Sequence, residues 1–124
     1  MGMKMEKDLE LKALDSFIGT TAYYRYLGVL LTDGVKYVME NGYSWFVSDA
    51  VAVIICPPPK LKEYLQKETF LAISLKLNGD SSADMIITDG NYNELYRQHY
   101  KFTDAKREIK LFYSNGVLML PSEY

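Results

Sequence analysis

The chain has 124 residues, of which 48% are hydrophobic and 24% are charged, and its formal net charge is −2. This is the composition of an ordinary globular domain, which argues against a disordered chain and against a strongly basic nucleic-acid-binding surface. The single cysteine, Cys56, excludes an internal disulfide and favours a reducing compartment. The first residues hold no continuous apolar run, and the most apolar stretch is shorter than the roughly 20 residues of a membrane-spanning helix. We therefore expect one cytoplasmic domain over residues 1–124, flexible over 1–7, without a signal peptide and not associated with a membrane.

The first predicted helix covers Asp8–Ile18, where leucine and isoleucine recur at spacings of three and four. Gly19 follows at a position typical of a helix end. The tyrosine-rich stretch Thr20–Val29 has no clear period and is interpreted as irregular or briefly extended.

Two further helices are predicted before the middle of the chain. Thr32 or Asp33 caps the second, and Asn41-Gly42 ends it. Ser44 is the predicted cap of the third, Trp45–Cys56, whose apolar residues surround almost the whole circumference. A helix with apolar residues on all sides is typically buried, so its last residue, a thiol, is interpreted as inert packing.

The period changes to two in the second half of the chain, which indicates strands. The stretch Tyr92–Phe102 fits either a helix or a strand, and we prefer a strand for its second half. Asn115-Gly116 predicts a tight hairpin turn. The expected strands are Leu71–Leu77, Ala83–Thr88, the second half of Tyr92–Phe102, Ile109–Ser114 and Val117–Leu120. The predicted fold class is α+β, with about three N-terminal helices packed on a C-terminal antiparallel meander of about four strands.

The sequence contains no recognisable catalytic, cofactor-binding or metal-binding motif. Its one histidine, His99, and its one cysteine do not form a zinc site, and its glycines are not spaced as in a phosphate-binding loop. We assign no catalytic, cofactor or metal residue and expect no cofactor. This favours a binding module over an enzyme.

One acidic residue allows an alternative. Asp49 lies in the apolar third helix, and a buried carboxylate needs a partner, for which Arg25 is the predicted basic residue. A structural ion pair is the simpler interpretation. The alternative is a small enzyme with a carboxylate, arginine and tyrosine site around Asp33, Asp49 and Arg25.

Tyrosine and arginine dominate binding hot spots, and the chain has eleven tyrosines. Stacked tyrosines also bind single-stranded bases, but the surrounding positive charge that such a groove needs is lacking, so protein recognition is preferred and nucleic acid ranks third. A homodimer is compatible with an open edge strand. The candidate binding surface comprises Tyr23, Tyr24, Arg25, Tyr26, Asp33, Asp49 and Tyr124.

Several segments, taken in order, form a recognisable set: Phe17-x-Gly19-Thr20, Tyr24-Arg25, Leu31 to Val35 with Tyr37, Trp45 with Asp49-Ala50, and Asn115 to Tyr124. Together they resemble a family of small uncharacterised bacterial and mobile-element proteins that is classified as a domain of unknown function. The resemblance implies a compact intracellular domain and no activity. The chain departs from the family between Phe102 and Arg107, so the partner of that loop, if it is a contact surface, is expected to differ here.

Overall fold

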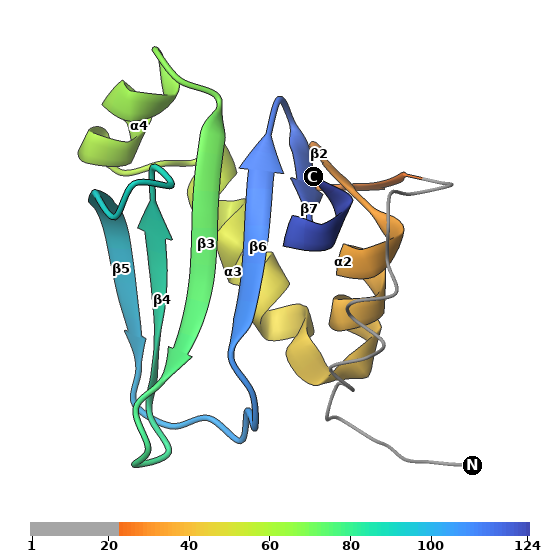
Figure 1. The fold of residues 1–124 in the computed structure, drawn as a ribbon, viewed down its shortest axis with the longest axis vertical. Coiled ribbons are helices and arrows are strands. Elements are labelled where there is room, and N and C mark those ends of the chain that lie inside the picture. Colours follow the sequence, from red (N-terminus) through yellow and green to blue (C-terminus); the bar gives the residue numbers. More distant parts are fainter. Residues whose placement is uncertain (1–22) are drawn as a thin grey trace.

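The computed structural model describes residues 23–124, so the predicted helix Asp8–Ile18 and the segment 1–7 lie outside the described residues. The described part is an α+β fold in which a mixed sheet lies in front of one long helix (Figure 1). Its strands are β1 Tyr24–Tyr26, β2 Val29–Leu31, β3 Phe70–Leu77, β4 Ala83–Thr88, β5 Glu94–Tyr100, β6 Ile109–Ser114 and β7 Val117–Met119. Its helical segments are α2 Asp33–Val38, η1 Met39–Tyr43, α3 Ser44–Ile55, α4 Pro59–Leu65 and η2 Pro121–Glu123.

The predicted four-stranded antiparallel meander is wrong in detail, because the sheet has seven strands in the order β1-β2-β7-β6-β3-β4-β5. The connection after β5 returns the chain to the far side of β3, where β6 pairs antiparallel with it. The β6–β7 hairpin around Asn115-Gly116 is confirmed, and β7 then pairs parallel with β2. The fold class is confirmed, but its topology depends on pairings between distant segments.

The hairpin β1–β2 was not predicted as strands. Each strand has only three residues, too few for a period of two to be recognised. Its turn is Leu27-Gly28, with φ angles of 51° and 92°. Positive φ at both turn positions suits a hairpin, but leucine rarely adopts it, so the sequence carried a weak turn signal.

The second and third predicted helices are confirmed with corrected ends. The side chain of Thr32 accepts a hydrogen bond from the backbone N–H of Val35, as predicted for the cap of α2. The chain kinks at Gly42, where φ is 99°. Ser44 is the first residue of α3 rather than its cap, and Cys56 is exposed beyond its end, which corrects the prediction of a buried thiol.

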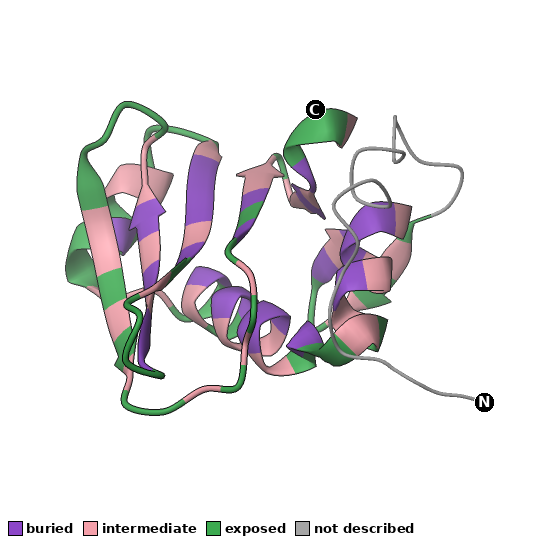
Figure 2. Cartoon of the chain, turned by 60° about the horizontal axis from the view of Figure 1, so that its bottom comes forward, coloured by how far each residue is buried: buried purple, intermediate pink, exposed green. Residues whose placement is uncertain are grey.

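The core lies between α3 and one face of the sheet, which we call the inner face. Buried α3 residues such as Phe46 and Ala50 form one cluster with buried strand residues such as Ile73, Met85 and Leu111. Figure 2 colours the buried parts of the helix and of the strands purple. The opposite, outer face is turned toward the viewer in Figure 1. Neighbouring residues of a strand point to opposite faces, so the register assigns each strand residue to one of them. Among residues 23–124, none of the helices has the length and apolar character needed to cross a membrane.

Candidate functional site

The hairpin β1–β2 separates Tyr24 and Tyr26 of the predicted binding surface from its arginine. Tyr24 and Tyr26 pair with the buried residues Leu31 and Val29, so they lie on the inner face. The hydroxyl of Tyr26 is 2.8 Å from that of Ser48 on α3. Arg25 lies between them and therefore points to the outer face, where it is exposed. The Tyr-Tyr-Arg-Tyr segment is thus not one continuous binding patch.

Asp49 is held by side chains of β5 rather than by the predicted arginine. Its Oδ2 accepts hydrogen bonds from the Tyr100 hydroxyl at 2.8 Å and from Gln98 Nε2 at 3.3 Å. The hydroxyl of Tyr96 donates to Gln98 Oε1 at 2.9 Å. Burial, followed by the bond to the Asp49 carboxylate, raises the pKa of Tyr100 far above its usual value, so its hydroxyl stays a donor. The alternation of Tyr96, Gln98 and Tyr100 was visible in the sequence, but their pairing with α3 was not.

The three residues of the alternative catalytic site are dispersed in the structure. Asp33 is the first residue of α2, Asp49 contacts the edge strand β5, and Arg25 lies on the other edge strand, β1, on the outer face. A reacting group would need all three to converge on one position. The described geometry therefore offers no support for this arrangement.

A junction between α2 and the end of the chain was missed by the sequence analysis. Glu123 Oε1 accepts hydrogen bonds from Thr32 Oγ1 at 2.6 Å and from the Leu120 backbone N–H at 2.9 Å. Its Oε2 accepts from the Gly34 backbone N–H at 3.0 Å. A Cβ at position 34 would lie 2.6 Å from Leu120 Cδ1, so a larger residue there would force the Leu120 side chain to move. Two segments that carry the resemblance described above, one ending at Val35 and the other at Tyr124, meet at this structural junction.

The outer face carries an aromatic cluster to which the last residue belongs. The ring of Tyr124 lies edge-on to Phe70 and Phe112, with centroid distances of 5.4 and 5.5 Å. Phe70 and Phe112 are 5.0 Å apart. Tyr124 is nevertheless 73% exposed. The ring of Tyr124 therefore packs against the sheet while most of its surface stays accessible.

The register extends this cluster across the sheet. Phe70 pairs with Ser114, Ser114 with Val117, Val117 with Leu30, and Leu30 with Arg25. Paired residues share a face, so these five residues form one row on the outer face, running from β3 to β1. We call this row, with Phe112 and Tyr124, the outer-face row.

A charged cluster occupies the other end of the outer face. His99 Nδ1 and Arg97 Nη1 contact the two carboxylate oxygens of Asp84 at 2.7 and 3.0 Å. The hydrogen bond from His99 is the main reason that the pKa of Asp84 lies below its usual value. Arg97 also contacts Glu94, and this bond lowers the pKa of that carboxyl. These groups neutralise one another at the surface, which is the behaviour of a solvated ion-pair network.

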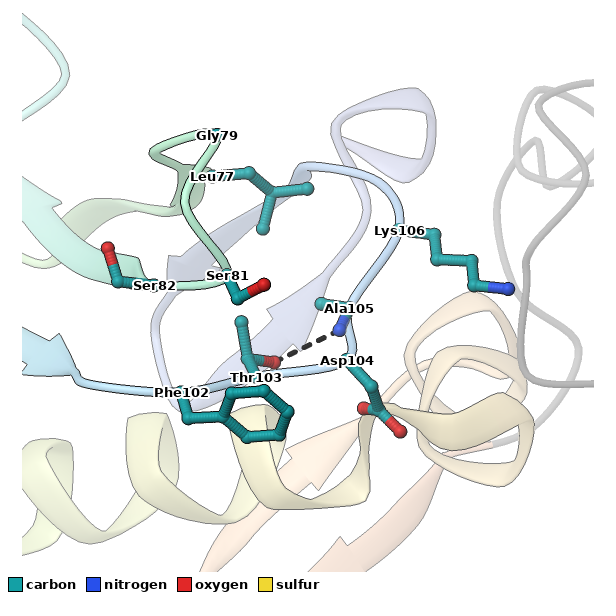
Figure 3. A pocket seen from close by; sticks show the side chains of 9 residues that line it. All are labelled: Leu77, Gly79, Ser81, Ser82, Phe102, Thr103, Asp104, Ala105 and Lys106. Carbon is teal, nitrogen blue, oxygen red and sulfur yellow. Dashed lines mark hydrogen bonds between the residues drawn. The ribbon is translucent and has the colours of Figure 1, made fainter.

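The surface of the described residues carries hollows that are open to solvent. One, of about 430 Å³, lies between the β3–β4 turn and the loop after β5, and its lining includes Leu77, Ser81 and Phe102 (Figure 3). A neighbouring hollow is lined by the aromatic side chains of Trp45, Tyr100 and Phe102. Within residues 23–124, no group of three histidine, cysteine, aspartate or glutamate side chains is placed to hold a metal ion.

Comparison with known proteins gives a family without a function. No curated protein and no solved structure matches the chain. Residues 8–124 match a family whose description is that its function is unknown. The match covers nearly the whole sequence, and the chain therefore belongs to the family of unknown function DUF6876.

Proposed function

We propose that this domain is a small protein-binding module that recognises another protein through the outer-face row. The observation that carries the proposal is the aromatic cluster of the half-buried Phe70 and Phe112 with the exposed Tyr124, continued along one register line to Arg25. Aromatic residues and arginine supply most of the binding energy in protein interfaces. The regulatory or accessory role in a bacterial mobile element, and the cytoplasmic location, are part of this proposal and rest on the resemblance and the composition.

The chemistry of the row suggests the chemistry of the partner. Its middle is apolar, with Leu30 and Val117, and its two ends carry cations. Arg25 lies at one end, and Lys110 Nζ stands 5.8 Å from the ring of Phe112 near the other. A partner that presents an apolar side chain between acidic groups would match this pattern. A second copy of this chain is an alternative occupant that the experiment below distinguishes.

The test compares three forms of the full chain as bait in a lysate of the native host. The double variant Arg25→Ala/Tyr124→Ala removes two exposed side chains of the row, and Tyr92→Ala removes an aromatic ring that is 98% exposed outside it. We expect one stoichiometric protein to co-purify with wild type and Tyr92→Ala, and to be lost with the folded double variant. Its identity and its binding to the purified domain would then be established by mass spectrometry and calorimetry.

Three outcomes contradict the proposal. Equal capture by all three baits would exclude the outer-face row as the binding surface. Recovery of the bait alone, repeated at low salt, would exclude a stable partner in that lysate. If sedimentation shows a dimer that the double variant disrupts, the row is a homodimer interface instead.

A further inference from the structure

A hollow of about 290 Å³ opens where the N-terminal part of α3 meets the end of β5 and the loop that follows. Its lining is Trp45, Tyr100, Phe102, Thr103 and Asp104, and we call it the aromatic pocket. Three of these five side chains are aromatic and one is a carboxylate. It lies apart from the outer-face row, because Trp45 belongs to α3 and Tyr100 points to the inner face.

Two of the aromatic walls are held in place by their own polar atoms. The Trp45 indole N–H donates to the Gly42 carbonyl at 3.0 Å, and the Tyr100 hydroxyl donates to Asp49 at 2.8 Å. The two rings stand nearly perpendicular, at 79°, with centroids 5.1 Å apart. Since both polar tips are already bonded within the protein, these two walls present ring surface rather than free donors.

The third wall comes from a loop that is anchored at three points. The Thr103 backbone N–H donates to the Ser81 carbonyl at 2.8 Å, and Ala105 N–H donates to the Thr103 hydroxyl at 3.1 Å. The Lys106 backbone N–H donates to the Tyr43 hydroxyl at 3.4 Å. The Phe102 ring and the Asp104 carboxylate both extend from this loop toward α3 (Figure 3). Phe102 is 77% exposed although the next residue, Thr103, is anchored, so its ring is available to a ligand.

We propose that the aromatic pocket binds an organic cation of the methylated ammonium class. The negative faces of aromatic rings attract such cations, and cages of several rings are the usual way in which proteins recognise them. Asp104 at the rim adds a full negative charge. The loop's other charged side chains do not line the pocket; they are Lys101, Lys106, Arg107 and Glu108. The ligand is either a methylated lysine side chain of a protein or a small choline-like solute, because both present the same head group.

Trp45 is the only tryptophan of the chain, so its fluorescence and its indole NMR signal report directly on the pocket. The purified full chain is titrated with choline at constant ionic strength, and separately with 3,3-dimethylbutanol, the neutral molecule of the same shape. We expect a saturable change with choline and none with the neutral molecule, because the attraction depends on charge.

Two variants locate the site, and a third serves as a matched control. Phe102→Ala removes an exposed ring and Asp104→Asn removes only the charge, and each is expected to weaken choline binding by about 3- to 30-fold. Tyr92→Ala, which removes an exposed ring outside the pocket, should bind choline as wild type does. Thermal unfolding of each variant checks that the fold is intact.

A second arm distinguishes the two sources of the head group. Short peptides that contain lysine or trimethyllysine at one position are titrated in the same way. Binding of the trimethyllysine peptide at least tenfold tighter than choline assigns the pocket to a modified protein, and equal affinity assigns it to the head group alone. The proposal is overturned if neither choline nor the trimethyllysine peptide changes the Trp45 signals. It is also overturned if the neutral molecule binds wild type as tightly as choline does, or if the Phe102→Ala variant binds choline as tightly as wild type does. The outer-face variants leave this pocket unchanged. Failure of the cation-binding proposal can therefore be distinguished from failure of the protein-binding proposal.

Discussion

The junction at Glu123 and the aromatic pocket each combine a carboxylate with side chains from distant parts of the sequence, but they use them differently. Glu123 accepts three hydrogen bonds from Thr32, Gly34 and Leu120, and a Cβ at position 34 would displace the Leu120 side chain. Asp104 is exposed at the rim of an open hollow, next to a ring that is 77% exposed. The junction uses its polar groups to hold the fold, whereas the pocket leaves charge and ring surface available for a ligand.

The contrast between the junction and the pocket also bears on what membership of the family implies for this chain. The junction joins segments near both ends of the described chain, and its geometry restricts the residue types that fit. Similarity at such a place identifies a shared fold. The pocket places no comparable restriction on Phe102 or Asp104. Substitution at the junction should therefore lower the stability of the fold, whereas substitution at the pocket rim should leave stability nearly unchanged and weaken ligand binding.

The largest effect is expected from Glu123→Ala. Removal of the carboxylate leaves the donors of Thr32, Gly34 and Leu120 without their acceptor, which should lower the free energy of unfolding by about 2–3 kcal/mol. Urea denaturation followed by circular dichroism measures this. Glu40→Ala removes an exposed carboxylate that pairs with Lys36, and should change stability by less than about 0.5 kcal/mol. Equal losses of stability in Glu123→Ala and Glu40→Ala would show that the junction stabilises the fold no more than an exposed ion pair does.

Gly34→Ala perturbs the same junction from α2 by adding a methyl group there. The new methyl group would lie 2.6 Å from Leu120 Cδ1 and 2.7 Å from Glu123 Oε1, so both side chains must move. We expect a loss of about 1–3 kcal/mol in the same denaturation experiment. The double variant with Glu123→Ala should lose less than the sum of the two single losses, because both act on one contact. Additive losses would contradict the described geometry.

Tyr100→Phe tests the wall that the aromatic pocket shares with the core. The folded-state pKa of Tyr100 is raised above the ordinary value of 10.0, so the protonated hydroxyl is favoured by folding. The contribution of this hydroxyl to the free energy of unfolding is complete below pH 10 and is lost as the pH rises above 10. The loss is at most about 1.4 kcal/mol per pH unit, and it is smaller here because the ring is partly exposed. The variant should therefore lose stability less steeply than wild type between pH 10 and pH 11. Part of the slope will persist, because the pKa values of Tyr64 and Tyr113 are also raised.

The smallest effect on stability is expected at the pocket rim. Phe102→Ala and Asp104→Asn alter exposed side chains, and each should change the free energy of unfolding by less than about 0.5 kcal/mol. Thermal unfolding at neutral pH measures this. A loss as large as that of Glu123→Ala would mean that the loop holds the fold, and the contrast between the two regions would then disappear.

Local patterns predicted those elements that are long enough to show a period. The strand β3 follows a strict alternation, α2 begins at a capping threonine, and Asn115-Gly116 has the turn chemistry of its hairpin. The β1–β2 hairpin escaped prediction because its strands have three residues each and its turn places Leu27 at positive φ. The partner of Asp49 was misidentified because alternation along β1 turns Arg25 away from α3, which no local pattern reveals.

The sequence by itself determined that the chain forms an α+β fold, where most helices and strands begin and end, and that it lacks the usual catalytic motifs. These properties follow from periodicity, capping and turn chemistry, which act over a few neighbouring residues. Only the tertiary structure decided the strand order, the junction of Glu123 with α2, the outer-face row and the aromatic pocket. Each of these brings together residues that are far apart in the chain, and such contacts depend on how the whole core packs.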